Sequence, residues 1–187
     1  MNIVFCHGAM GPKFNWNTRT YDANGWWSDW LQFYTEFEHD VITQKPYFPH
    51  AHILLMKYEE WEHIMDYQEI TSDTVLVGHS AGGGFVLKYL ALHPELRVRQ
   101  VVLVAPYLDT EDFQPFGFYR GFDFDDGIVA RTGQGMDVMI SDDDFPYIKE
   151  SVNRIAEKMP SARIHRFTGR GHFNGPELPE IMQIIRW

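Results

Sequence analysis

Residues 74–84 have the sequence Thr74-Val75-Leu76-Val77-Gly78-His79-Ser80-Ala81-Gly82-Gly83-Gly84, and this stretch decides the fold. The apolar and β-branched residues from Thr74 to Val77 predict a buried strand, and Phe85 to Leu92 predict a helix that starts near Gly84. Between them, Gly78 to Gly82 match the pattern G-x-S-x-G, in which a serine lies on a sharp turn between a strand and a helix. In this setting the pattern favours a nucleophilic serine over a turn with only a structural role.

The residue types in this turn have a physical basis. The turn is so tight that Ser80 is expected to have a strained backbone, and a glycine two residues away on each side avoids clashes with the strand and the helix. The Ser80 hydroxyl then projects above the carboxyl end of the sheet, near the positive end of the following helix. We expect that helix end and the Ala81 backbone N–H to stabilise an oxyanion.

Working outward from the turn, short apolar strands alternate with amphipathic helices. Near-continuous apolar strands separated by helices are typical of a parallel sheet that is covered on both faces. The predicted fold is therefore α/β, a compact, doubly wound sheet of about six parallel strands in a single domain that spans residues 1–187. The predicted strands are Ile3–Cys6, Val41–Thr43, Thr74–Val77, Val101–Val104, Met136–Ile140 and Ala162–Phe167, and the predicted helices are Trp26–Phe37, Ala51–Tyr67, Phe85–Leu92, Tyr147–Met159 and Glu177–Ile185.

The composition restricts the class of protein. A chain of 187 residues with 44% hydrophobic and 16% aromatic residues is neither disordered nor collagen-like. The net charge of −10 would repel nucleic acids and anionic membranes, so neither is expected as a partner. The single cysteine, Cys6, excludes an internal disulfide, and the first residues show no export signal. A cytoplasmic protein is expected.

One segment departs from the alternating pattern. Residues Tyr107 to Gly127 are rich in aromatic and acidic residues and predict no regular element. Such a segment is either a lid or pocket wall, or a cover for the edge of the sheet. Together with Trp16, Trp26 and Trp27, its rings could build an apolar pocket for an acyl group.

A nucleophilic serine needs a base, and nine histidines are available. His172 follows the last predicted strand, in Gly171-His172-Phe173, and so lies at the same edge of the sheet as Ser80. His79 is assigned to packing, whereas His7 follows the first strand and could line the site. His50 and His52 lack a third ligand at metal spacing, so no metal site is expected.

The carboxylate that orients the base is expected after the strand that ends at Ile140, in Ser141-Asp142-Asp143-Asp144. Spacing alone does not choose between Asp143 and Asp144, and at least two of these aspartates could instead cap the helix after Pro146. A second oxyanion donor is expected from the loop after the first strand, where Gly8 permits a turn and Ala9 offers its N–H. A simple turn would also explain that loop.

These residues resemble the α/β-hydrolase superfamily and, more narrowly, the small serine hydrolases related to retinoblastoma-binding protein nine. The resemblance implies a six-stranded parallel sheet and a cofactor-free Ser-Asp-His triad that acts on esters, amides or short peptides. By this resemblance Ser80 is the nucleophile, His172 the base and Asp144 the acid; Phe145 replaces a common Pro of the family, which keeps Asp143 as the alternative. The matching segments are Gly25–Trp30, Val77–Gly82, Val101–Tyr107, Gly117–Tyr119, Ser141–Asp144 and Phe167–Phe173.

The sequence thus predicts a serine hydrolase that forms an acyl-enzyme on a small ester, amide or peptide substrate and needs no cofactor. The Ala9 and Ala81 N–H groups would form the oxyanion hole. Two alternatives remain: an acyltransferase with an acceptor other than water, and a catalytically idle binding protein on the same scaffold.

Overall fold

The computed structural model describes residues 1–9, 27–51, 55–108, 118, 119 and 121–187. Within these residues the chain forms a six-stranded sheet in the order β2-β1-β3-β4-β5-β6, and each pair of neighbours is parallel. This arrangement confirms the predicted fold class. The strands are β1 (Asn2–Cys6), β2 (Ile42–Gln44), β3 (Thr74–His79), β4 (Gln100–Val104), β5 (Met136–Ser141) and β6 (Arg163–Phe167).

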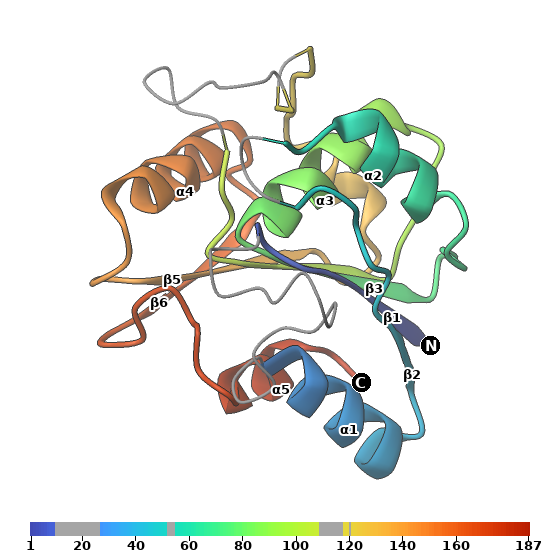
Figure 1. The fold of residues 1–187 in the computed structure, drawn as a ribbon. Coiled ribbons are helices and arrows are strands. Elements are labelled where there is room, and N and C mark those ends of the chain that lie inside the picture. Colours follow the sequence, from blue (N-terminus) through green and yellow to red (C-terminus); the bar gives the residue numbers. More distant parts are fainter. Residues whose placement is uncertain (10–26, 52–54, 109–117, 120) are drawn as a thin grey trace.

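Helices cover both faces of the sheet. In Figure 1 the helices α1 and α5 lie on one face, whereas α2, α3 and α4 lie on the other. Because both faces are covered, β3, β4 and β5 are buried at every position, which explains their almost continuous apolar sequences. The helices are α1 (Trp27–His39), α2 (Tyr58–Met65), α3 (Ala81–Leu92), α4 (Pro146–Lys158) and α5 (Pro179–Ile184).

The predicted helix from Ala51 to Tyr67 differs at its start, because α2 begins only at Tyr58 and the described residues before it, 51 and 55–57, are not helical. The preceding residue, Lys57, has an extended backbone with φ −124° and ψ 127°. Leu55, which lies within the predicted range, is 54% exposed. A start at Tyr58 places Glu59 and Glu60 in the first turn, where the helix dipole favours negative charge.

The helix after the turn also differs from the prediction, since α3 begins at Ala81 and not near Gly84. Its glycines lie inside the first turns because other backbone segments pack directly against them. A Cβ on Gly82 would lie 2.1 Å from the Cys6 carbonyl oxygen, and one on Gly84 would lie 1.9 Å from the Tyr107 carbonyl oxygen. The glycines therefore let α3 approach β1 and the loop after β4.

A buried carboxylate at the amino end of β5 ties the end of the chain to the sheet. Asp137 is fully buried and accepts hydrogen bonds from Arg163 at 2.7 and 2.8 Å and from Arg186 at 2.9 Å. Gln100 and His165 bind the same carboxylate. Burial alone would raise the pKa of Asp137, but these hydrogen bonds outweigh it and hold the pKa well below its usual value.

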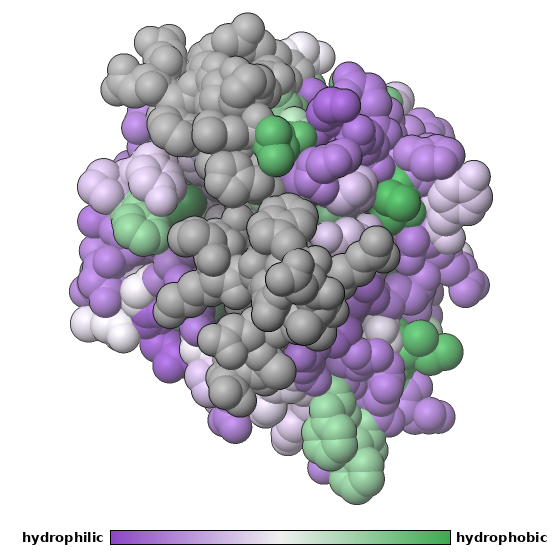
Figure 2. All heavy atoms as spheres, in the orientation of Figure 1, coloured by the Kyte–Doolittle hydropathy of each residue, from purple (hydrophilic) through white to green (hydrophobic). Residues whose placement is uncertain are grey.

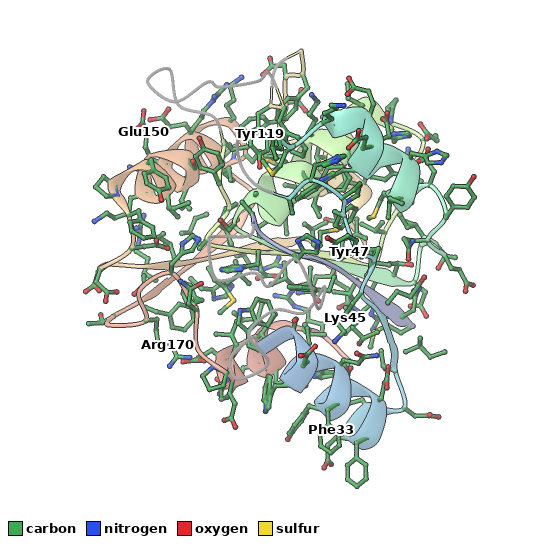
Figure 3. All side chains as sticks on the ribbon, viewed as in Figure 1. Phe33, Lys45, Tyr47, Tyr119, Glu150 and Arg170 are labelled. Carbon is green, nitrogen blue, oxygen red and sulfur yellow. The ribbon has the colours of Figure 1, made fainter. Side chains whose placement is uncertain are left out.

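The surface is mostly hydrophilic in the view of Figure 2. One exception is the outer side of α1, where Phe33 and Phe37 stack with their ring centroids 5.7 Å apart and are 66% and 74% exposed; Figure 3 labels Phe33 there. Among the described residues, no helix has the length and apolar character that crossing a membrane requires.

Candidate active site

The predicted site residues follow the carboxyl ends of neighbouring parallel strands. The loop His7–Ala9 follows β1, Ser80 follows β3, and Tyr107 lies in the loop after β4. Asp144 follows β5, and His172 follows β6. Because parallel strands end at one edge of the sheet, the fold brings these five segments to the same side of the molecule.

Ser80 has the strained backbone that the sequence predicts. Its φ of 52° and ψ of −119° lie outside the regions that residues with a side chain usually adopt. Two hydrogen bonds of 2.9 Å hold it there, one from its own N–H to the Val104 carbonyl and one from the Tyr107 N–H to its carbonyl. The Ser80 hydroxyl makes no capping hydrogen bond to the backbone of α3, so it is not engaged by the helix.

The structure brings His172 and Asp144 together. His172 Nδ1 lies 2.9 Å from Asp144 Oδ1, and the Asp144 side chain is fully buried, whereas that of His172 is 14% exposed. Since an ionised carboxylate only accepts hydrogen bonds, Nδ1 carries the proton and Nε2 of the neutral ring is left as the basic atom. The same carboxylate oxygen accepts the Phe145 N–H at 2.7 Å.

The other two aspartates of this segment hold the loop that carries His172. Asp143 accepts the Ser141 hydroxyl at 2.5 Å and the Gly171 N–H at 2.9 Å, and these bonds keep the pKa of Asp143 below its usual value. Asp142 accepts the Gly169 N–H at 3.2 Å. The alternative that they cap α4 is wrong, since its N-cap residue is Phe145 and no side chain caps the helix. Of the two candidate acids, Asp144 contacts His172.

His79 has a contact that sequence reasoning missed. Its Nε2 lies 2.9 Å from the backbone carbonyl of His172, to which it donates because a carbonyl only accepts. Burial is the main cause that lowers the pKa of His79 to about 3, and electrostatic repulsion between the two rings of His79 and His172 lowers it further. The His79 ring is therefore neutral. The ring also packs against Trp27, as the assignment to packing implies. His79, which directly precedes Ser80, therefore links the end of β3 to the loop that carries His172.

The loop after β1 lies directly against Ser80. A Cβ on Gly8 would be 3.0 Å from the Ser80 Cβ. His7 accepts the Phe48 N–H at Nε2 (3.1 Å), so its Nδ1–H donates to the Gly8 carbonyl at 2.8 Å. Burial lowers the pKa of His7 to about 4, which keeps this arrangement neutral. Because the peptide is planar and trans, a fixed Gly8 carbonyl also fixes the opposite direction of the Ala9 N–H.

One contact expected at this edge is missing in the described residues. No hydrogen bond joins the Ser80 hydroxyl to His172, although such bonds commonly tighten only when substrate is bound. Within the same residues, no group of three or more His, Cys, Asp or Glu side chains could hold a metal ion.

Comparison with known proteins places this geometry in a family. The sequence profile described as the alpha/beta hydrolase fold matches residues 70–175, which include Ser80, Asp144 and His172. The chain belongs to the alpha/beta hydrolase family. A curated relative, the serine hydrolase RBBP9 of Rattus norvegicus, is 27% identical over 117 residues. The matched stretch spans 60% of this chain and 60% of that relative.

Solved structures share the alpha/beta hydrolase fold with this chain. The ydeN gene product of B. subtilis is 21% identical with a TM-score of 0.73 over 98% of this chain and 95% of that chain. The naproxen esterase (carboxylesterase NP) of Bacillus subtilis is 12% identical with a TM-score of 0.64 over 99% and 83%. Est1E of Butyrivibrio proteoclasticus, solved with ferulic acid bound, is 14% identical with a TM-score of 0.59 over 97% and 85%.

The aromatic residues predicted for an acyl pocket have different positions in this alpha/beta hydrolase. Trp27 is fully buried and packs against Phe5 and His79, whereas Trp16 and Trp26 lie outside the described residues. Most of the stretch from residue 107 to residue 127 that precedes Phe118 also lies outside them. Phe118 packs on Trp61 of α2 and on Phe85 of α3, with centroids 5.1 and 6.3 Å apart. Phe118 therefore packs over α2 and α3.

Proposed function

We propose that the protein is a serine hydrolase that cleaves a carboxylic ester, amide or short peptide bond through an acyl-enzyme. In this proposal Ser80 is the nucleophile, His172 the general base and Asp144 the carboxylate that orients it. The Ala9 and Ala81 N–H groups stabilise the oxyanion. One observation carries the proposal: His172 Nδ1 bonds to the fully buried Asp144 carboxylate, and the backbone carbonyl of His172 accepts a hydrogen bond from His79, the residue before Ser80.

The reaction proceeds in two halves. First, Ser80 Oγ attacks the substrate carbonyl carbon while His172 Nε2 takes the hydroxyl proton, and the carbonyl oxygen becomes an oxyanion. When this intermediate collapses, the bond to the leaving group breaks and His172 returns the proton to the leaving atom. A water molecule then repeats the attack on the acyl-enzyme, with His172 as its base, and releases the carboxylic acid and the free Ser80 hydroxyl.

The local structure supports these roles. Ala81 is the first residue of α3, and the first N–H groups of a helix have no partner within it. The positive end of the helix at Ser80 and the close approach of Gly8 to Ser80 support the roles proposed for the Ala81 and Ala9 N–H groups. The names of the relatives, a serine hydrolase and an esterase, agree with hydrolysis of an ester.

The proposal includes a small-molecule substrate and a cytoplasmic location. The net charge of −10 argues against nucleic acids and anionic membranes as partners. The residues assigned above supply the nucleophile, the base and the oxyanion donors, so the mechanism needs no cofactor.

The test compares the wild type with Ser80→Ala. A fluorophosphonate probe should label the wild type and not the variant, and hydrolysis of p-nitrophenyl acetate or of an aminoacyl arylamide should fall by at least about a thousandfold. Circular dichroism should show that the variant remains folded. Labelling of Ser80→Ala would refute the assignment, and a wild type that neither labels nor hydrolyses would support the idle binding protein. Product analysis with added alcohol or amine separates hydrolysis from acyl transfer.

A further inference from the structure

Two aromatic rings at the start of α4 are exposed beside the predicted base. Phe145 and Tyr147 stack with their centroids 5.3 Å apart and an interplanar angle of 5°, and they are 49% and 43% exposed. Single exposed rings are common on protein surfaces, but a stacked pair with parallel planes presents a larger apolar surface on which a further planar ring can pack.

The first ring of the pair is fixed to the catalytic residues. The Phe145 ring lies 5.4 Å from the His172 imidazole, centroid to centroid. Phe145 directly follows Asp144, and its N–H donates to the carboxylate oxygen that His172 Nδ1 also binds. The carboxylate that orients the base therefore also sets the backbone that carries this ring.

The second ring continues towards the nucleophile. Tyr147 packs edge to face against Tyr107, with centroids 5.7 Å apart, and the Tyr107 N–H donates to the Ser80 carbonyl. Tyr107 in turn packs against Tyr119, whose hydroxyl donates to the Ala81 carbonyl at 2.8 Å. Figure 3 labels Tyr119 on the face of the sheet where α2, α3 and α4 lie.

The two inner rings support the two outer ones. The four rings of Phe145, Tyr147, Tyr107 and Tyr119 form a row. Tyr107 and Tyr119 are only 4% and 8% exposed, so they anchor this row to the turn at Ser80. Phe145 and Tyr147 present the accessible surface. The row thus extends from the backbone of the nucleophile to the ring of the base, and the exposed part of it lies at the base.

The chemistry of acyl transfer decides what this exposed surface would meet. His172 gives its proton to the leaving atom, so the leaving group must lie beside His172 when its bond breaks. We propose that Phe145 and Tyr147 form a binding surface for a planar apolar leaving group, so that the preferred substrates are esters or amides of aryl alcohols or aryl amines. This inference rests on the proposed function. It assigns the pair to the leaving group and not to the acyl group.

The experiment separates the two halves of the substrate. With the acetyl group constant, 2-naphthyl acetate and phenyl acetate are compared with hexafluoroisopropyl acetate, whose leaving alcohol has similar acidity but is not planar. With phenol constant, phenyl butyrate is compared with phenyl acetate. The variants are Phe145→Ala and Phe145→Leu. Phe33→Ala is the control, because Phe33 is also an exposed phenylalanine but lies on α1, away from Phe145.

Phe145→Ala should lower kcat/KM for 2-naphthyl acetate about tenfold, as expected for the loss of one ring contact. Any effect of the lost Phe145 contact on His172 acts equally on every ester, so the ratio of kcat/KM for 2-naphthyl acetate to that for hexafluoroisopropyl acetate should still fall at least about fivefold, and the ratio of butyrate to acetate should stay constant. Phe145→Leu, which keeps apolar volume but not the plane, should fall between the wild type and Phe145→Ala. Phe33→Ala should match the wild type with every substrate.

Equal losses on the planar and non-planar acetates, or a change in the butyrate-to-acetate ratio, would overturn the inference while leaving the hydrolase proposal intact. If the wild type hydrolyses none of these esters, the proposed function itself fails. Binding of 2-naphthol to Ser80→Ala, followed by fluorescence, measures the surface without catalysis. Its dissociation constant should rise about tenfold when Phe145→Ala is added, and an unchanged constant would contradict the proposed surface.

Discussion

Replacing Asp144 by Asn removes one negative charge from the proposed site with little change in shape. The carboxylate lies 2.9 Å from His172 Nδ1 and its side chain is fully buried. At an effective dielectric constant of about 20, Coulomb's law gives an upper bound of about 6 kcal/mol for the attraction between this charge and the imidazolium that forms during the reaction. Each factor of ten in rate corresponds to about 1.4 kcal/mol, so the largest expected loss is about four orders of magnitude.

We therefore expect Asp144→Asn to lower kcat for p-nitrophenyl acetate by about a thousandfold to ten-thousandfold, with a similar KM. Asp143→Asn is the matched control, because Asp143 is exposed and bonds to Ser141 and Gly171 instead of His172. Its activity should stay within about tenfold of the wild type. Both variants are checked by thermal unfolding and fluorophosphonate labelling. An Asp143→Asn variant that loses as much activity as Asp144→Asn would refute the reasoning, as would a nearly active Asp144→Asn.

Three further substitutions test other parts of the structure. His79→Leu should lower kcat up to about a hundredfold, because the His172 carbonyl loses its hydrogen bond from His79. His79→Gln can still donate to that carbonyl and should retain most activity. Equal kinetics for the two variants would show that the bond does not position His172. Gly82→Ala should lower the free energy of unfolding in urea by about 1 to 3 kcal/mol or more, because its Cβ would lie 2.1 Å from the Cys6 carbonyl oxygen; wild-type stability would contradict that close approach. Asp137→Asn should lower the free energy of unfolding by about 3 to 5 kcal/mol at pH 7. In the folded protein the pKa of Asp137 lies below its ordinary value of 3.8, so the carboxylate stabilises the fold above pH 3.8 and this stabilisation is lost as the pH falls below it. The difference in the free energy of unfolding between the wild type and Asp137→Asn should therefore narrow at pH 3. A difference that does not depend on pH would be inconsistent with a depressed pKa.

The sheet could be predicted from the sequence because its strands are buried on both faces. Val101–Val104 was predicted from four consecutive apolar residues, and the strand differs only by including Gln100. The start of α2 at Tyr58 could not be predicted in the same way. Leu55 matches helical spacing, but the pattern does not reveal that Lys57 has an extended backbone and that Leu55 faces solvent.

The candidate site was predictable only to the level of segments. Parallel strands bring Ser80, the aspartates and His172 to one edge, which their order in the sequence already indicates. The choice of Asp144 over Asp143 depends on the direction of two adjacent side chains, and one residue of displacement in a turn reverses that direction. The bond from His79 to His172 joins residues 93 positions apart, and only the three-dimensional packing of β3 and the loop after β6 reveals it.

The left-handed conformation at residue 80 limits which side chains could serve as the proposed nucleophile. A φ of 52° is tolerable for a side chain with a single heavy atom beyond Cβ, but a second branch at Cβ is strongly disfavoured there. Sulfur could therefore replace oxygen at this position, as in Ser80→Cys, whereas the secondary alcohol of threonine would strain the main chain before any chemistry began. The geometry of the bend would thus restrict a nucleophile at this position to side chains that are not branched at Cβ.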